Sequence, residues 1–282
     1  MRAVFQRLIL PASRACRGNT QIGNAKKAVN FVRNAMSESG SSGFDSPRLV
    51  TKKVLAKLQR EGDGAAVRRS IGRSELRSLD PFLMLDEFSV SAPGGFPDHP
   101  HRGFETVTYM LEGSFTHQDF AGHNGYQELL SSDIKTAEND GVEVRIIAGE
   151  SMGVESPVYT RTPTMYLDFT MQPRTQFHQP IPETWNAFIY IIEGEGVFGV
   201  PNSSPIAAHH TVVLGPGEGM SAWNRSSSKP LRFVLIAGQP LNQPVVQHGP
   251  FVMNTEAEIH QAIEDYHNSR NGFEMAKYWR SQ

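Results

Sequence analysis

The chain has little of several features that identify common classes of protein. Cys16 is the one cysteine among 282 residues, which excludes an internal disulfide and a cysteine-based metal cluster. The formal net charge is −2, so the chain as a whole shows no electrostatic basis for binding nucleic acid. No apolar run approaches the roughly 20 residues that cross a bilayer, and we expect no membrane partner. Hydrophobic residues make up 39% and charged residues 20%, a balance typical of a globular protein.

Acidic residues are absent from the N-terminus, where none precedes Glu38 while arginine and lysine recur. This basic segment contains two apolar stripes at helical spacing. A basic, amphipathic leader of this kind indicates an organelle transit peptide, for a mitochondrion or a chloroplast, and the alternative is a disordered basic tail. We predict that residues 1–47 are a transit peptide and disordered linker, and that initiation at Met36 would give a leaderless form. The stripes are Val4, Phe5, Leu8 and Ile9, and Ala28, Val29, Val32 and Ala35.

A pair of histidines begins the stretch that carries chemistry. His99 and His101 are two residues apart at the start of a strand-like run. Alternate residues of an extended chain point to the same face, so the pair aims two imidazoles into one pocket, half of a site for a divalent metal. Glu105 has the same parity and is a further candidate ligand, although a structural contact with Arg102 or with a backbone amide would also explain it. Solvated loop histidines are the alternative for the pair.

Most of the chain after Arg48 shows short strand patterns separated by turns rich in Gly and Pro. Thr164–Met171 alternates cleanly and predicts a half-buried antiparallel strand. One helix is predicted after Asn254, with Thr255 as its N-cap and Asn271-Gly272 at its end. Residues 126–140 are polar and show no strand period. Many strands and one late helix predict an all-β fold of barrels or sandwiches.

A short repeat indicates two similar β domains in tandem. Tyr109-Met-Leu-Glu-Gly113 matches Tyr190-Ile-Ile-Glu-Gly194, 81 residues later. His101 and His99 precede Tyr109 by eight and ten residues. The residues eight and ten positions before Tyr190 are Pro182 and Pro180, so the second copy has no histidine pair. The second copy has a Pro-Gly turn at 216–217 that the first lacks. The first barrel is therefore expected to be short of strands.

Several long runs of residues resemble the pirin family. The N-terminal signature of that family is similar to Phe96-Pro-Asp-His-Pro-His-Arg-Gly-Phe-Glu-Thr-Val107, and the likeness covers about residues 48–280. The resemblance implies an all-β fold of two tandem cupin (jelly-roll-like) barrels with a C-terminal helix. It divides the chain into an N-terminal cupin domain at 48–141, truncated here, and a C-terminal cupin domain at 142–282. Further matching runs are Arg68–Gly72, Leu79–Leu83, Tyr159–Pro163, Gln179–Pro182, Val234–Gly238 and Gln247–Asn254.

The resemblance also implies a function. Pirins bind one iron in the N-terminal barrel with three histidines and a glutamate, and the first two histidines match His99 and His101. The family is described as nuclear cofactors of transcription factors, and its plant members, whose leaders this one resembles, are linked to G-protein signalling. Some members are quercetin 2,3-dioxygenases, which makes a flavonol the alternative partner. The family implies the nucleus or cytoplasm as the compartment.

The sequence departs from the family where the remaining ligands should lie. In the family, the Gly-His-x-Gly motif is followed by a Pro-Gly-Asp turn and by the strands that carry the third histidine and the glutamate. Here Gly122-His-Asn-Gly125 runs directly into Tyr126–Asp133, which resembles sequence well downstream in the family. We therefore predict an incomplete N-terminal barrel and weak or absent iron binding. His117 and His123 are expected at the surface, His209 and His210 in structural roles, and His248 at a turn.

Three functions follow from these observations. The first is a pirin-type regulatory partner of transcription or signalling proteins. The second is a flavonol dioxygenase that uses iron, and the third is a non-functional splice product. Loss of half the ligands favours the first or the third, because protein contacts survive such a loss and oxygen chemistry does not.

Overall fold

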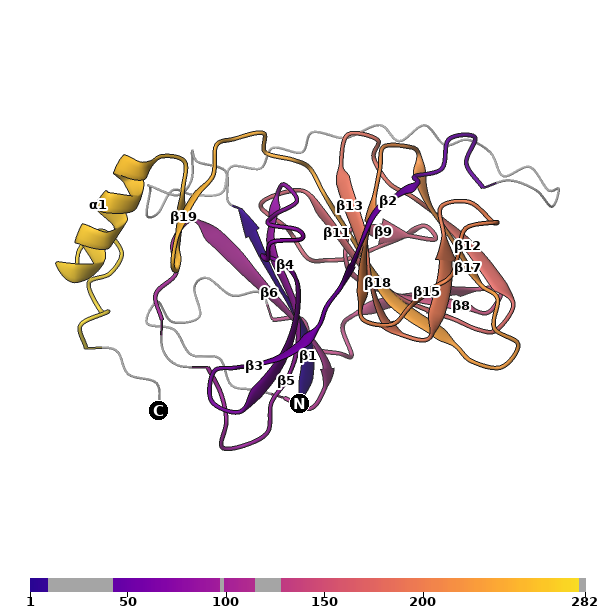
Figure 1. Ribbon diagram of the computed structural model, residues 1–282, viewed down its shortest axis with the longest axis horizontal. Helices are drawn as coiled ribbons and strands as arrows, with labels where there is room; N and C mark the ends of the chain where they lie inside the picture. Colours follow the sequence, from indigo (N-terminus) through magenta and orange to yellow (C-terminus); the bar gives the residue numbers. More distant parts are fainter. Residues whose placement is uncertain (10–42, 97–98, 115–127, 279–282) are drawn as a thin grey trace.

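The computed structural model describes residues 1–9, 43–96, 99–114 and 128–278, which form a mostly β structure with one helix. Figure 1 shows a first sheet in the middle, a second β unit at one end and the C-terminal helix at the other. This arrangement confirms the predicted fold of two tandem cupin-like β units with a terminal helix. No helix among the described residues is long and apolar enough to span a membrane.

The first sheet is antiparallel and includes the N-terminus of the chain. Its second-last strand, β1, is hydrogen-bonded to β5 on one side and to β6 on the other. The helical interpretation of residues 4–9 is therefore wrong, because backbone pairing on both sides outweighs a weak local period. In spatial order the sheet contains β3 (Leu58–Glu61), β4 (Ala65–Ile71), β5 (Phe82–Ser89), β1 (Arg2–Ile9) and β6 (Phe104–Glu112).

The second unit consists of a seven-stranded and a four-stranded sheet. The seven-stranded sheet begins with β2, which lies in the chain between β1 and β3 of the first sheet, and ends with β7, which lies in the polar stretch where no strand was predicted. Its order is β2 (Val50–Leu55), β16 (His210–Leu214), β13 (Asn186–Glu193), β18 (Leu231–Gly238), β11 (Thr164–Met171), β8 (Val142–Ala148) and β7 (Lys135–Asn139). The smaller sheet has the order β12 (Thr175–Pro180), β17 (Gly219–Asn224), β14 (Glu195–Phe198) and β15 (Ile206–Ala207).

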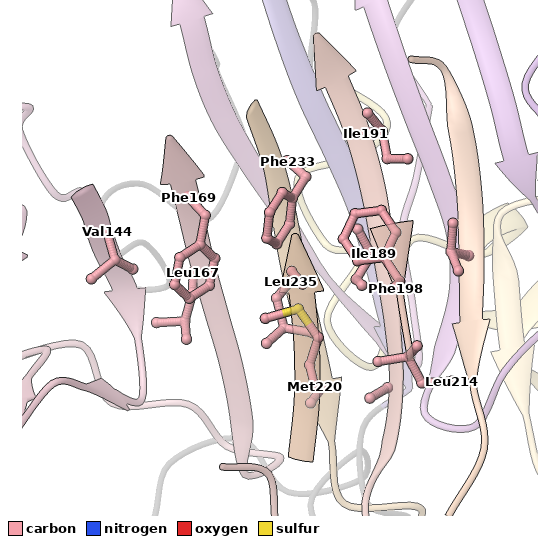
Figure 2. Packing of buried hydrophobic residues seen from close by; sticks show 14 of the residues in the cluster. Val144, Leu167, Phe169, Ile189, Ile191, Phe198, Leu214, Met220, Phe233 and Leu235 are labelled. Atoms are coloured by element: carbon pink, nitrogen blue, oxygen red, sulfur yellow. The ribbon is translucent and has the colours of Figure 1, made fainter. Parts of the chain in front are cut away.

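Apolar side chains fill the interior of the second unit. The rings of Phe169 and Phe233 stack with centroids 5.2 Å apart, and Phe198 meets Phe233 edge-on at 5.3 Å. Figure 2 shows these rings with Leu167, Leu235 and Met220 between the two sheets. The side chains of this cluster are all apolar, and none is a His, Cys, Asp or Glu that could bind a metal.

The first sheet packs against the outer face of the seven-stranded sheet. Phe82 meets Phe188 with ring centroids 5.1 Å apart, and Tyr109 meets Tyr166 at 5.7 Å. This contact explains a difference from the sequence pattern: β11 was predicted to be half-buried, but Tyr166 and Asp168 on its more polar face are also buried. The period of two is present, and the neighbouring unit covers the face that solvent would otherwise contact.

The helix α1 (Glu256–His267) closes the described part of the chain. Thr255 is its N-cap as predicted, and a capping box with Glu258 satisfies the first amides. The helix ends at His267, with Asn268 as the C-cap, earlier than the predicted Asn271-Gly272. It packs on the hairpin of β19 (Val246–His248) and β20 (Phe251–Met253), and a further short hairpin joins β9 (Glu150–Ser151) to β10 (Val154–Glu155).

Candidate metal half-site and the carboxylate–tyrosine pairs

His99 and His101 lie side by side just before β6. Their ring centroids are 4.5 Å apart, so the structure brings together the two residues that the sequence paired by parity. His101 also contacts the ring of Phe104 at 5.0 Å, and its Nε2 atom is buried, whereas His99 is exposed. The pair thus lies at the surface in an edge contact, with one ring exposed and the other partly buried.

The segment that follows the pair is fastened to the C-terminal hairpin and helix. Gly103 has φ +90°, and a Cβ there would overlap the carbonyl oxygen of Val252. The Arg102 guanidinium donates to Asp265 at 2.8 Å and lies 4.1 Å from the centre of the Phe273 ring. These contacts hold the histidine segment against α1.

Asp265 is the buried anchor of this junction. Its burial raises the pKa, but hydrogen bonds from Arg102, Asn271, Gln261 and Arg270 outweigh that effect and lower the pKa well below its usual range. The carboxylate therefore stays charged at neutral pH and keeps its contact with Arg102.

Glu105 does not pair with Arg102, one of the two structural partners expected for it. The carboxylate contacts Arg161 at 3.2 Å instead. Burial raises the pKa of Glu105, and the nearby Arg161 charge offsets only part of that increase. Arg102 is occupied with Asp265, because the C-terminal helix, which lies far away in the sequence, packs beside it.

The other histidines do not complete a metal site within the described residues. His117 and His123 lie outside the described residues. His209 Nδ1 lies 2.9 Å from Glu87, and His210 Nδ1 lies 3.0 Å from the carbonyl oxygen of Ala207. His248 ends β19 at a tight turn. Across the described ranges, no three His, Cys, Asp or Glu side chains gather in a way that could hold a metal ion. Two imidazoles are fewer donors than a resident iron needs, so the described residues do not by themselves make up an iron centre.

Two buried tyrosines each donate to a carboxylate of the other β unit, a feature that the sequence analysis missed. Tyr190 in the second unit donates to Glu87 on β5, and Tyr109 on β6 donates to Asp168 on β11 at 2.7 Å. The offset of 81 residues that links the two tyrosines also links Glu87 to Asp168. Extending the repeat upstream from the tyrosines would have identified the two carboxylates.

An arginine neutralises each carboxylate. Arg2 contacts Glu87 at 2.6 Å, and Arg232 contacts Asp168 at 2.7 Å. Burial raises the pKa of Glu87, but Tyr190, Arg2 and His209 together lower it below its ordinary value. Burial and the facing carboxylates raise the pKa values of Tyr109 and Tyr190. The tyrosines therefore remain protonated donors, and each cluster joins the two β units.

Comparison with known proteins identifies the family. The profile described as "Pirin" matches residues 64–139, and that of the "Pirin C-terminal cupin domain" matches residues 166–272. The chain is 60% identical over 291 residues to the pirin-like protein of Solanum lycopersicum, across 86% of this chain and 100% of the relative. It is 47% identical over 286 residues to the pirin of Homo sapiens, across 84% of this chain and 98% of that one. This chain belongs to the pirin family.

The fold is also found among solved structures. The crystal structure of GK1651 from Geobacillus kaustophilus has a TM-score of 0.56 and 22% identity, across 71% of this pirin-family chain and 99% of that one. Both alignments with the two pirin relatives are longer than the 282 residues of this chain, although they use only 86% and 84% of it. Parts of each relative therefore lie opposite gaps in this chain.

Proposed function

We propose that this pirin-family protein is a regulatory binding partner of another protein, with an impaired metal site, rather than an oxygenase. The observation that carries the proposal is the donor set. The rings of His99 and His101 are in edge contact with centroids 4.5 Å apart, and among the described residues no three His, Cys, Asp or Glu side chains gather in a way that could hold a metal ion. The class of partner, a transcription factor or a G-protein signalling component, comes from the family resemblance.

Oxygen chemistry makes stricter demands than protein binding. An iron oxygenase must hold its metal with several ligands and still leave positions for substrate and oxygen. The buried cluster of the second unit, which includes Phe169, Phe198 and Phe233, contains no His, Cys, Asp or Glu that would replace the missing ligands. The second unit has both of its sheets in the described residues, and this supports a role of its exposed surfaces in contacting a partner.

Iron retention tests the impaired site. The full chain is loaded with ferrous iron without oxygen, dialysed against a weak chelator and measured by elemental analysis. We expect well under one iron per chain, and the same result for His260→Ala, an exposed histidine of α1. His99→Ala should remove the weak binding that remains. One iron retained per chain after dialysis would contradict the proposal.

Oxygen uptake with quercetin separates the binding protein from the dioxygenase. We expect no uptake above that of the iron-free protein. Sustained, iron-dependent uptake that is lost in His101→Ala would overturn the proposal and establish the flavonol oxygenase instead.

We further propose that the basic leader directs the full chain to an organelle, while a form that starts at Met36 stays in the nucleus or cytoplasm. The basic, acid-free composition before Glu38 supports this proposal. Fluorescent fusions at the C-terminus of the two forms test it, and an identical distribution would refute it.

A further inference from the structure

The N-terminal strand β1 occupies the position in the first sheet that β18 occupies in the seven-stranded sheet. β1 lies between β5 and β6, and β18 lies between β11 and β13. The repeat offset of 81 residues places β5 on β11 and β6 on β13, since it takes Glu87 to Asp168 and Tyr109 to Tyr190. Figure 1 shows β1 within the first sheet, although it is separated along the chain from the strands on both sides.

The register of the two strands agrees over residues 2–7, after which the pairing of β1 with β5 shifts between Arg7 and Leu8 and the pairing of β18 with β11 does not. Val4 lies opposite Glu87 and Tyr109, and Val234 lies opposite their equivalents Asp168 and Tyr190. The irregularity in the pairing of β1 with β6 is shared. The pairing of β1 with β6 skips Leu111, and the pairing of β18 with β13 skips Ile192, which is its equivalent under the same offset.

The two strands also carry an arginine at the equivalent position. Arg2 precedes Val4 by two residues, and Arg232 precedes Val234 by two. Each arginine forms an ion pair with the equivalent carboxylate, at 2.6 Å and 2.7 Å, and the arginine side chains are 30% and 28% exposed. The amino group of Met1 continues the contact by donating to the carbonyl oxygen of Val90 at 2.9 Å.

We propose that the gap between β5 and β6 is a strand-binding slot, and that residues 2–9 of this chain are its ligand. In this arrangement the start of the basic leader replaces a strand that the shorter first repeat lacks. Recognition requires a backbone that pairs on both sides, a small apolar residue opposite Glu87 and Tyr109, and an arginine two residues before it. A chain that starts at Met36 contains the slot without the strand, and its β5 and β6 present unpaired backbone groups.

Hydrogen exchange on the full chain tests the slot. Val4→Asp places a carboxylate beside Glu87, and Val29→Asp makes the same change elsewhere in the leader. We expect residues 2–9 to be protected in the unaltered chain. Val4→Asp should increase exchange in residues 2–9, 82–89 and 104–112 at least tenfold and leave 164–171 unchanged, whereas Val29→Asp should change none of them. Exchange in residues 2–9 at the rate of an unstructured peptide, or equal effects of the two variants, would overturn the proposal.

Cysteine pairs test the register and the source of the strand independently of stability. In a Cys16→Ser background, Ala3→Cys with Met110→Cys joins residues that face each other across β1 and β6. Ala3→Cys with Thr106→Cys is the matched pair four residues out of register. We expect an intramolecular disulfide in the first pair and none in the second. Equal disulfide formation in the two pairs would overturn the assigned register, and a disulfide that joins two chains would show that a second copy fills the slot.

Discussion

Removing the hydroxyl of Tyr109 tests whether the carboxylate–tyrosine pairs hold the two β units together. In Tyr109→Phe the ring keeps its contact with Tyr166, at 5.7 Å, so the change is confined to the donor of the 2.7 Å hydrogen bond. Asp168 is 1% exposed and keeps the two nitrogens of Arg232, at 2.7 and 3.2 Å. A hydrogen bond to a charged group contributes about 1.5–3 kcal/mol. We therefore expect the free energy of unfolding to fall by about that amount.

The measurement is urea unfolding followed by circular dichroism, together with thermal unfolding. At roughly 2–4 °C for each kcal/mol, the melting temperature should fall by about 3–12 °C. Tyr190→Phe should behave similarly, because Glu87 likewise keeps Arg2 and His209. Tyr278→Phe removes a hydroxyl from a residue that is 73% exposed and serves as the control, with a change within about 0.5 kcal/mol. If Tyr109→Phe matched that control, the hydrogen bond between the units would contribute nothing measurable.

Three further predictions concern acid sensitivity, the histidine segment and the start of the chain. The folded pKa of Glu87 lies below its unfolded value, so the stabilisation from this carboxylate is present above about pH 4.5 and is lost as the pH falls through the folded pKa. In urea titrations Glu87→Gln should therefore reduce the loss of stability that occurs below about pH 4.5. Glu138→Gln is the control and should leave that loss unchanged. Gly103→Ala should destabilise the protein by about 1–3 kcal/mol more than Gly64→Ala, because both glycines have positive φ but only Gly103 faces the carbonyl oxygen of Val252; equal losses in thermal unfolding would count against that contact. A chain that starts at Met36 should aggregate at a lower temperature than the full chain in light scattering, since its slot is open; identical onset would argue that β1 protects nothing.

Local patterns were enough to predict the elements whose pairing and burial agree with those patterns. The alternation of Thr164–Met171 predicted β11 with its observed bounds, and Thr255 with Glu258 marked the start of α1. Residues 135–139 show the opposite case. Their burial pattern is mostly exposed, because β7 is an edge strand held by β8, and an exposed edge leaves no apolar period in the sequence.

Some contacts of the candidate site were likewise predictable from the sequence, and others were not. The spacing of His99 and His101 sufficed to predict that they meet, although the structure places the pair just before β6 and not on the strand itself. The partners of Glu105 and Arg102 were not predictable, since Arg161 and Asp265 come from other parts of the chain and reach the site only through packing. The tyrosine–carboxylate pairs lie between these cases, because the repeat contains the signal but only the packed sheets show that each pair crosses from one unit to the other.

The packing of the two sheets explains how the first sheet binds a strand from a distant part of the chain. The side chains that line the slot are positioned by contacts that do not involve β1. Tyr190 and His209 of the second unit hold Glu87, and Asp168 holds Tyr109. An incoming strand therefore meets a carboxylate whose position is already set by Tyr190 and His209, and it supplies Arg2 and backbone groups. A preorganised site lowers the ordering cost of binding. The second unit therefore positions the side chains of the first sheet that contact β1. Weakening the hydrogen bond between Tyr190 and Glu87 should weaken the binding of β1 in the sheet, even though Tyr190 is not part of the first sheet.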